Sequence, residues 1–246
     1  GLKAVLLTHL LWAEQPSRDA AWRDETAALP EADALRDDIE TLSPATRLPC
    51  FELALARLAK APLRERQDLI LAARRMLTAA RTGRPIDRLL WLAMRRAFGE
   101  SPWAAAHNPA EGDIAELPAL EMRYIAHYTA HLARMVPGTE PARDPDNAAG
   151  QRWYTAVMAR WQPPAAVLDW HRPDVDAVVH ALNGLQALSW MQRPLLVRAW
   201  IGEALALTRP APLQPGAADA LRLSCMLLDC PLPPELSRLY VDLGTA

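Results

Sequence analysis

Apolar residues recur at helical spacing along almost the whole chain, and this pattern restricts the fold more than any other feature. The first stretch shows it at Leu2, Val5, Leu6, His9, Leu10 and Ala13. No segment alternates apolar and polar residues for long, as a half-buried β-strand would. The 22 prolines separate these stripes, and few fall inside one. The sequence therefore predicts an all-α fold.

Capping and breaking residues predict ten to twelve helices. Pro49 is suited to the first turn of a short helix, and Pro62 begins a longer one that ends before the turn at Gly83. The other helices are expected at about 2–13, 17–29, 31–42, 86–98, 115–136, 148–161, 174–188, 193–208, 217–229 and 234–242.

A weak internal repeat predicts two related helical units in an orthogonal bundle. Residues 62–80 resemble residues 189–207, and a proline-containing turn follows each segment. A polar linker rich in glycine and proline at 99–113 is the expected subdomain boundary. The predicted organisation is an N-terminal helical cap at 1–43, a first unit at 44–100, a linker with connecting helices at 101–163, and a second unit at 164–246.

Composition narrows the class of protein. Hydrophobic residues make up 51% and charged residues 23%, as in ordinary folded domains. The net charge of −2 argues against a nucleic-acid partner. No stretch reaches the ~18 apolar residues of a membrane span. The three cysteines are an odd number, so we expect thiols in a reducing compartment rather than a disulfide framework.

His127 and His131 form the one candidate metal site. They lie four residues apart on an expected helix, and this spacing can chelate zinc. The zincin motif HExxH needs a glutamate directly after the first histidine, and here that residue is Tyr128. The alternative is a pair of histidines at the border of a helix–helix seam.

Other catalytic signatures are absent from the sequence. It contains no HExxH, GxSxG, GxxxxGK[ST] or GxGxxG. A dispersed serine–histidine–aspartate triad stays open, because its members need not be neighbours in sequence. The nine tryptophans are expected to anchor helix packing, and some of them could instead be interface anchors.

Charge is segregated along the chain. Residues 14–40 carry nine acids against three arginines, a balance of −6. Residues 57–96 carry eleven bases against three acids, a balance of +8. The two segments could neutralise each other by packing together. Alternatively, segment 57–96 could present a basic face to anionic lipid headgroups or to an acidic partner.

Two segments resemble the C-terminal region of bacterial membrane-bound zinc metallopeptidases, the relatives of the heat-shock protease HtpX and the CAAX prenyl proteases. Arg47–Leu55 (RLPCFELAL) is similar to an RLPLFELAL-type segment, and Leu228–Pro234 (LDCPLPP) to the LDCPLPP ending. Leu6–Asp24 resembles that family more loosely.

The resemblance implies a cytoplasmic domain tethered to the inner membrane by a peptidase domain ahead of Gly1. Zinc would belong to that peptidase domain, so this chain would hold no catalytic residue and no cofactor. The two helical units also resemble TerB-like units. In the first unit, however, Arg81 and Thr82 stand where the acidic metal-binding turn is expected.

The sequence thus predicts a non-catalytic accessory region of a membrane-associated zinc metallopeptidase. Its expected partners are the peptidase domain, a substrate protein or an anionic membrane surface at residues 57–96. One alternative is a metal-binding helical module that uses His127, His131 and a residue from another helix. The other is a freestanding hydrolase with a dispersed site.

Overall fold

The structure is a computed structural model that describes residues 1–11, 16–79, 83–99, 112–138, 146–163 and 166–243. Every regular element in these ranges is a helix, so the all-α prediction is confirmed. No described helix combines the length and apolar character needed to cross a bilayer. The chain divides into two compact units. Unit 1 comprises Gly1–Ser101 with Arg238–Ala246, and unit 2 comprises Pro102–Ser237.

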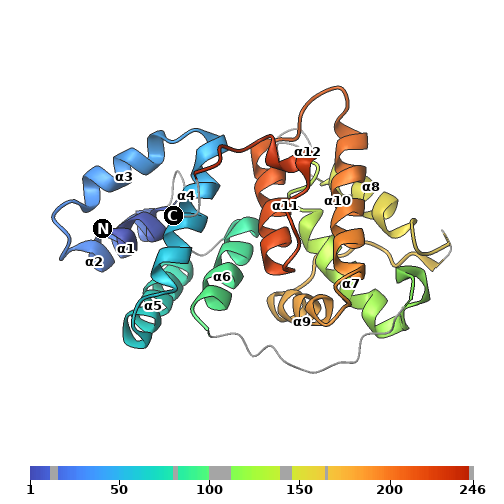
Figure 1. Ribbon diagram of the computed structural model, residues 1–246, viewed down its shortest axis with the longest axis horizontal. Helices are drawn as coiled ribbons and strands as arrows, with labels where there is room; N and C mark the ends of the chain where they lie inside the picture. Colours follow the sequence, from blue (N-terminus) through green and yellow to red (C-terminus); the bar gives the residue numbers. More distant parts are fainter. Residues whose placement is uncertain (12–15, 80–82, 100–111, 139–145, 164–165, 244–246) are drawn as a thin grey trace. The chain divides into compact units, whose positions relative to one another are not determined.

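Unit 1 is built around its first helix. Helix α1 contacts α2, α3, α4 and α5, and its apolar side chains Leu6 and Leu7 are fully buried. Trp22, Phe51 and Met76 fill the same core. The six helices of unit 1 are α1 (Leu2–Thr8), α2 (Pro16–Thr26), α3 (Ala32–Thr41), α4 (Pro44–Leu58), α5 (Leu63–Ala79) and α6 (Pro85–Ala97) (Figure 1).

The expected helix start at Pro49 is wrong, because α4 begins at Pro44 and contains Pro49. A proline inside a helix has no N–H to donate to the carbonyl four residues earlier, here that of Ala45. The Val241 N–H donates to this carbonyl at 3.0 Å. The C-terminal segment therefore supplies the donor that Pro49 lacks. It also explains why residues after 237, expected in the segment 164–246, belong to unit 1.

Unit 2 is held by hydrogen-bonded aromatic side chains. The Trp200 indole N–H donates to Thr129 Oγ1 at 3.0 Å, and that of Trp153 donates to the Trp200 carbonyl at 3.1 Å. The buried hydroxyls of Tyr128 and Ser224 are 3.0 Å apart. The unit contains η1 (Ile114–Glu116), α7 (Ala119–Leu132), α8 (Ala148–Met158), α9 (Val175–Gln186), α10 (Gln192–Thr208), α11 (Pro215–Leu227) and α12 (Pro234–Ser237).

Two expected helices of unit 2 are shorter than predicted. The stretch 115–136 is not one helix, because Pro118 separates η1 from α7. Leu117 is extended, with ψ 143°, as steric conflict with a following proline requires. The helix expected at 234–242 ends at Ser237. Most of the expected linker at 99–113 lies outside the described residues.

The two repeat-like segments each form one helix of 17 residues, α5 and α10. Their relatedness, the TerB-like character of the units and the four-segment division stay predictions. Segments 1–43 and 44–100 both fall within unit 1.

Candidate functional site

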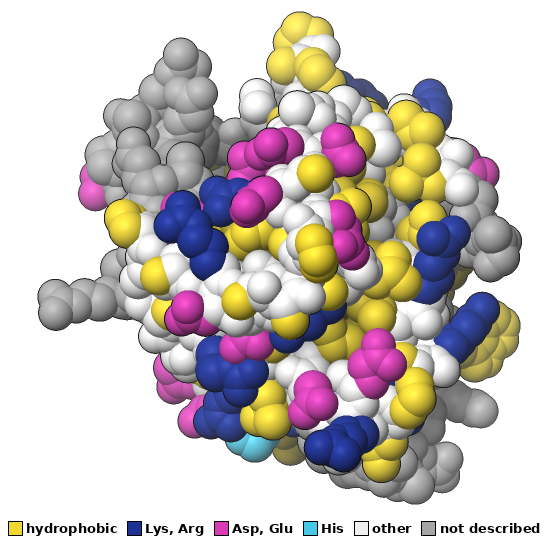
Figure 2. All heavy atoms as spheres, turned by 90° about the vertical axis from the view of Figure 1, so that its left-hand side faces the viewer, with side chains coloured by type: hydrophobic (Ala, Val, Ile, Leu, Met, Phe, Trp, Pro, Cys, Tyr) yellow, Lys and Arg dark blue, Asp and Glu magenta, His cyan; other side chains and the backbone are white. Residues whose placement is uncertain are grey.

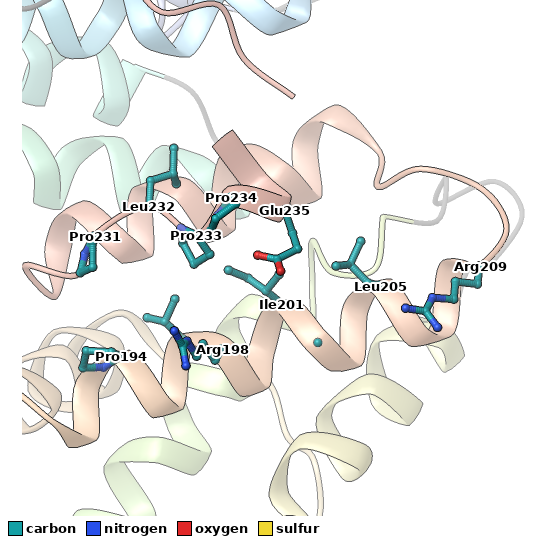
Figure 3. A pocket seen from close by; sticks show the side chains of 12 residues that line it. Pro194, Arg198, Ile201, Leu205, Arg209, Pro231, Leu232, Pro233, Pro234 and Glu235 are labelled. Carbon is teal, nitrogen blue, oxygen red and sulfur yellow. The ribbon is translucent and has the colours of Figure 1, made fainter. Parts of the chain in front are cut away.

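A groove of about 680 Å³ runs along α10 in unit 2, and we call it the α10 groove. One wall is α10 from Pro194 to Leu205, together with Arg209 directly after the helix. The other wall is residues 231–235, which we call the proline strap. Figure 3 shows Pro231, Leu232, Pro233, Pro234 and Glu235 facing Pro194, Arg198, Ile201, Leu205 and Arg209 across this groove.

The end of α11 sets the position of the proline strap. Asp229 is left-handed, with φ 53°, and the Cys230 N–H donates to the Cys225 carbonyl at 2.9 Å. This is the Schellman arrangement that ends many helices, and a proline commonly follows it. The Arg193 side chain donates to the Leu228 carbonyl at 2.8 Å and so ties this end of α11 to α10. Residues 231–234, the end of the segment Leu228–Pro234 noted in the sequence, therefore line one wall of the groove.

Helix α10 is apolar on its buried side and partly apolar on its exposed side. Leu196, Trp200 and Ala204 face the core of unit 2. The opposite side is exposed at spacings of four and three residues, at Met191, Leu195, Arg198, Gly202 and Ala206. A helix that only packs on a core has a polar opposite face. The exposed side of α10 is thus suited to contact with another apolar surface.

Gly202 lies in the middle of this exposed side. Glycine in a helix interior costs about 1 kcal/mol relative to alanine. Nothing lies within 4 Å of the place where a Cβ of Gly202 would be. No contact among the described residues therefore requires a glycine here, in contrast to Gly184 of α9, where a Cβ would overlap the Tyr124 ring.

The two walls of the α10 groove carry opposite charges. Arg198 and Arg209 are exposed on the α10 side, and Glu235 is exposed on the proline strap. Figure 3 shows the Glu235 carboxylate directed toward Ile201 of α10. Among the described residues, no ion pair of 4 Å or less includes any of these three side chains.

The structure places the two predicted metal ligands in different surroundings. His131 is 2% exposed and belongs to the interior of α7. His127 is partly exposed, and its ring contacts that of His171 edge-on, with centroids 5.2 Å apart. Burial lowers the pKa of His127, and the neighbouring His171 and Arg123 lower it further. In the described ranges, no three or more His, Cys, Asp or Glu side chains cluster as a metal site.

The oppositely charged segments of unit 1 meet in ion pairs. Glu25 of α2 pairs with Arg75 of α5 and, at 3.2 Å, with Lys3. A buried ion pair also joins the two segments, with the signs reversed. Its arginine, Arg18, belongs to the acidic segment, and its carboxylate, Asp87, belongs to the basic segment, 2.9 Å away. Figure 2 shows acidic and basic side chains interspersed on the face in view. Part of the sequence-level charge separation is therefore neutralised by packing.

The three cysteines are free thiols. Burial raises the pKa of Cys50, and it raises the pKa of Cys230 to about 11. A thiol with a raised pKa stays protonated at neutral pH and is a poor nucleophile. Cys225 is buried in α11. Cys225 is thus a packed core side chain, and Cys50 and Cys230 are partly buried.

Among the tryptophans that the structure describes, Trp190 is the most exposed. Trp22, Trp153 and Trp200 are fully buried, whereas Trp190 is 75% exposed directly before α10. Nothing in the neighbouring sequence distinguishes Trp190 from the other tryptophans, so its exposure could not be predicted. Its position at the start of the α10 groove helix makes it a candidate interface anchor. Comparison of the chain with protein-family models, curated proteins and solved structures finds no match.

Proposed function

We propose that this chain is a non-catalytic protein-interaction region and that the α10 groove is its binding surface. The observation that carries the proposal is the exposed apolar side of α10 beside a groove of about 680 Å³. Exposed apolar patches of this kind mark contact surfaces, whereas isolated exposed apolar residues are common on any protein. The open space at Gly202 supports close approach by a partner backbone.

The attachment to a zinc metallopeptidase belongs to this proposal and depends on sequence resemblance. The proline strap contains residues 231–234, the last four of the segment that resembles the metallopeptidase ending, so the partner would meet the region at that segment. A peptidase domain or its protein substrate would then occupy the groove. The predicted membrane tether and the contact of residues 57–96 with anionic lipid stay predictions alongside it.

Site-specific photo-crosslinking in cells tests the proposed function. A photoreactive amino acid at Leu205 lies in the groove, and one at Leu71 of α5 is a control on an exposed position of unit 1. We expect a discrete crosslinked partner from position 205 that disappears with Gly202→Trp. Equal crosslinking from both positions, or crosslinking insensitive to Gly202→Trp, would contradict a groove-specific interaction.

A metal-binding module is a second candidate, because the ring of His171 lies against that of His127. Two imidazoles from different segments can chelate a transition metal. Calorimetric titration of the chain and of its His131→Ala and His171→Ala variants with zinc tests this candidate. Micromolar binding lost with His171→Ala would favour the His127–His171 pair, and binding lost with His131→Ala would favour the i, i+4 pair. The dispersed hydrolase stays a prediction that an activity screen on ester, peptide and phosphate substrates would test.

A further inference from the structure

We infer that unit 2 binds phosphate groups at a row of basic side chains beside α7. The row consists of Arg123, His127, Arg134, His171 and Arg172, and we call it the α7 basic strip. None of these residues lines the α10 groove, so the inference goes beyond the proposed function and does not depend on it.

The open side of α7 is basic. From Arg123 to Leu132, every residue of α7 is buried except Arg123, Tyr124 and His127. Arg134 follows in the turn directly after the helix and is partly exposed. Spacings of four and seven residues return to the same face of a helix. Arg123, His127 and Arg134 therefore share the side of α7 that the core leaves open.

The segment before α9 adds two more basic side chains to this side. The Trp170 indole N–H donates to the Ala130 carbonyl of α7 at 3.2 Å. The His171 ring contacts the His127 ring edge-on, with centroids 5.2 Å apart. These contacts hold the exposed His171 and Arg172 beside α7. Two segments that are 40 residues apart thus form one positively charged surface.

The three arginines of the strip have no acidic partner among the described residues. No ion pair of 4 Å or less between described residues includes Arg123, Arg134 or Arg172. Arg134 is half-buried, and burial together with the positive charge of Arg172 lowers its pKa. A half-buried charge is costly unless an opposite charge compensates it, and a nearby like charge adds to the cost. An anion bound between Arg134 and Arg172 would remove both costs.

The two histidines extend the same arrangement toward Arg123. Burial lowers the pKa of His127, and the positive charges of His171 and Arg123 lower it further. Asp174 is the acid that acts on His127, but its carboxylate accepts the Ala177 N–H at 2.7 Å as the N-cap of α9. The surroundings of His127 therefore favour an anion over a metal cation, which would meet the same positive charges.

Phosphate is the anion that this set of donors suits. Guanidinium groups bind phosphate oxygens with two parallel N–H donors, and imidazole N–H groups add single donors. From Arg123 to Arg134 the helix and its last turn rise by about 16 Å, which is longer than one phosphate group. The strip therefore matches a ligand that carries several phosphates, either a soluble polyphosphate or the headgroups of phospholipids.

Calorimetric titration with inorganic tripolyphosphate at low salt tests the inference. We expect binding in the micromolar range. Arg123→Glu and Arg172→Glu should each weaken it by about tenfold or more, because each reverses an exposed charge of the strip. Arg198→Glu is the matched control, because it makes the same change at an exposed arginine of unit 2 in the α10 groove. An equal loss in the control would show a general charge effect and would overturn the site.

Flotation with vesicles separates the two sources of phosphate. Binding to phosphatidylcholine vesicles that contain phosphatidic acid, but not to phosphatidylcholine alone, and its loss with Arg172→Glu would assign the ligand to lipid headgroups. Binding of tripolyphosphate without vesicle binding would assign it to a soluble polyphosphate. A chain that binds neither probe would refute the inference and leave the proposed function of the α10 groove standing. Zinc binding that such a chain loses with His171→Ala would assign the histidines to metal binding instead.

Discussion

At the scale of single residues, Gly184 and Gly202, two of the helical glycines of unit 2, illustrate how neighbours decide the role of one residue type. Gly184 of α9 faces the Tyr124 ring of α7, and a Cβ there would overlap that ring. Gly202 of α10 faces open space. Each glycine destabilises its helix relative to alanine, but only at Gly184 does a described contact, that with the Tyr124 ring, require the absence of a side chain. For Gly202, no contact among the described residues accounts for this cost.

Alanine at these two positions should therefore have opposite effects. Gly202→Ala should stabilise the chain by up to about 1 kcal/mol, because it removes helix entropy cost without a clash. Gly184→Ala should destabilise it, because α7 and α9 must separate to accommodate the methyl group. Urea unfolding measured at one low protein concentration checks both variants. Equal effects of the two substitutions would contradict the packing described for α9.

His9 shows a conflict between burial and hydrogen bonding. Its two ring nitrogens lie 2.9 Å from the Val5 and Arg47 carbonyl oxygens. A neutral imidazole has one N–H, so only the charged form could donate to both. Burial nevertheless lowers the pKa of His9 below the ordinary 6.5 and outweighs the effect of the two carbonyls.

This direction predicts that the chain loses stability on acidification. The unfolded state binds a proton at His9 near pH 6.5, before the folded state does, so stability is full above this value and falls below it. His127 contributes with the same sign. Thermal unfolding between about pH 7.5 and about pH 5.5 measures the slope. His9→Gln should reduce that slope. Greater stability at acid pH would show instead that an imidazolium between the two carbonyls is favoured.

At the scale of elements, helix α4 depends on a segment that is remote in sequence. Its internal Pro49 leaves the Ala45 carbonyl without an intrahelical donor, and the Val241 N–H replaces it at 3.0 Å. The helix ladder is thus completed by the C-terminal segment of the chain. The contact joins α4 to Val241, which the sequence analysis placed in the second unit at 164–246.

Removing this N–H should weaken unit 1. Val241→Pro deletes the donor, and we expect a loss of about 1 kcal/mol, the usual contribution of one hydrogen bond. Val241→Ala keeps the N–H and is the control for the side chain. Hydrogen exchange of the α4 amides, together with urea unfolding, measures the effect. Equal destabilisation by both variants would assign the effect to the valine side chain.

At the scale of the whole molecule, the chain forms two compact units, and unit 2 is one continuous stretch of sequence. Residues 102–237 contain the core of Trp153, Trp200 and Tyr128 and both walls of the α10 groove. Unit 1 combines the N-terminal helices with the last residues of the chain. The α10 groove and the aromatic core that supports it therefore belong to one continuous segment.

A fragment of residues 102–237 should consequently fold by itself. We expect a helical circular dichroism spectrum and one cooperative thermal transition, because its buried aromatic cluster lies within the fragment. Residues 1–101 alone should be less stable than the same residues with the C-terminal segment, because they lack the Val241 donor. A fragment 102–237 without a cooperative transition would contradict this division.

Most helices and their boundaries could be predicted from local sequence patterns, because helical periodicity, caps and prolines act over a few neighbouring residues. For example, α10 was expected at 193–208 and lies at Gln192–Thr208. The predicted boundaries were wrong at Pro49 and Pro118. Pro49 lies inside α4, where the remote Val241 N–H replaces the missing donor, and Pro118 divides the helix expected at 115–136.

The exposed apolar side chains of α10 could not be predicted in this way, because they depend on how the helices pack. Leu195 and Leu196 are adjacent and equally apolar, yet Leu195 is 52% exposed and Leu196 is buried. The strap at 231–235 and the approach of His171 to His127 likewise depend on segments distant in sequence. Burial is a property of the packed molecule, so a local pattern that is apolar on several sides cannot specify it.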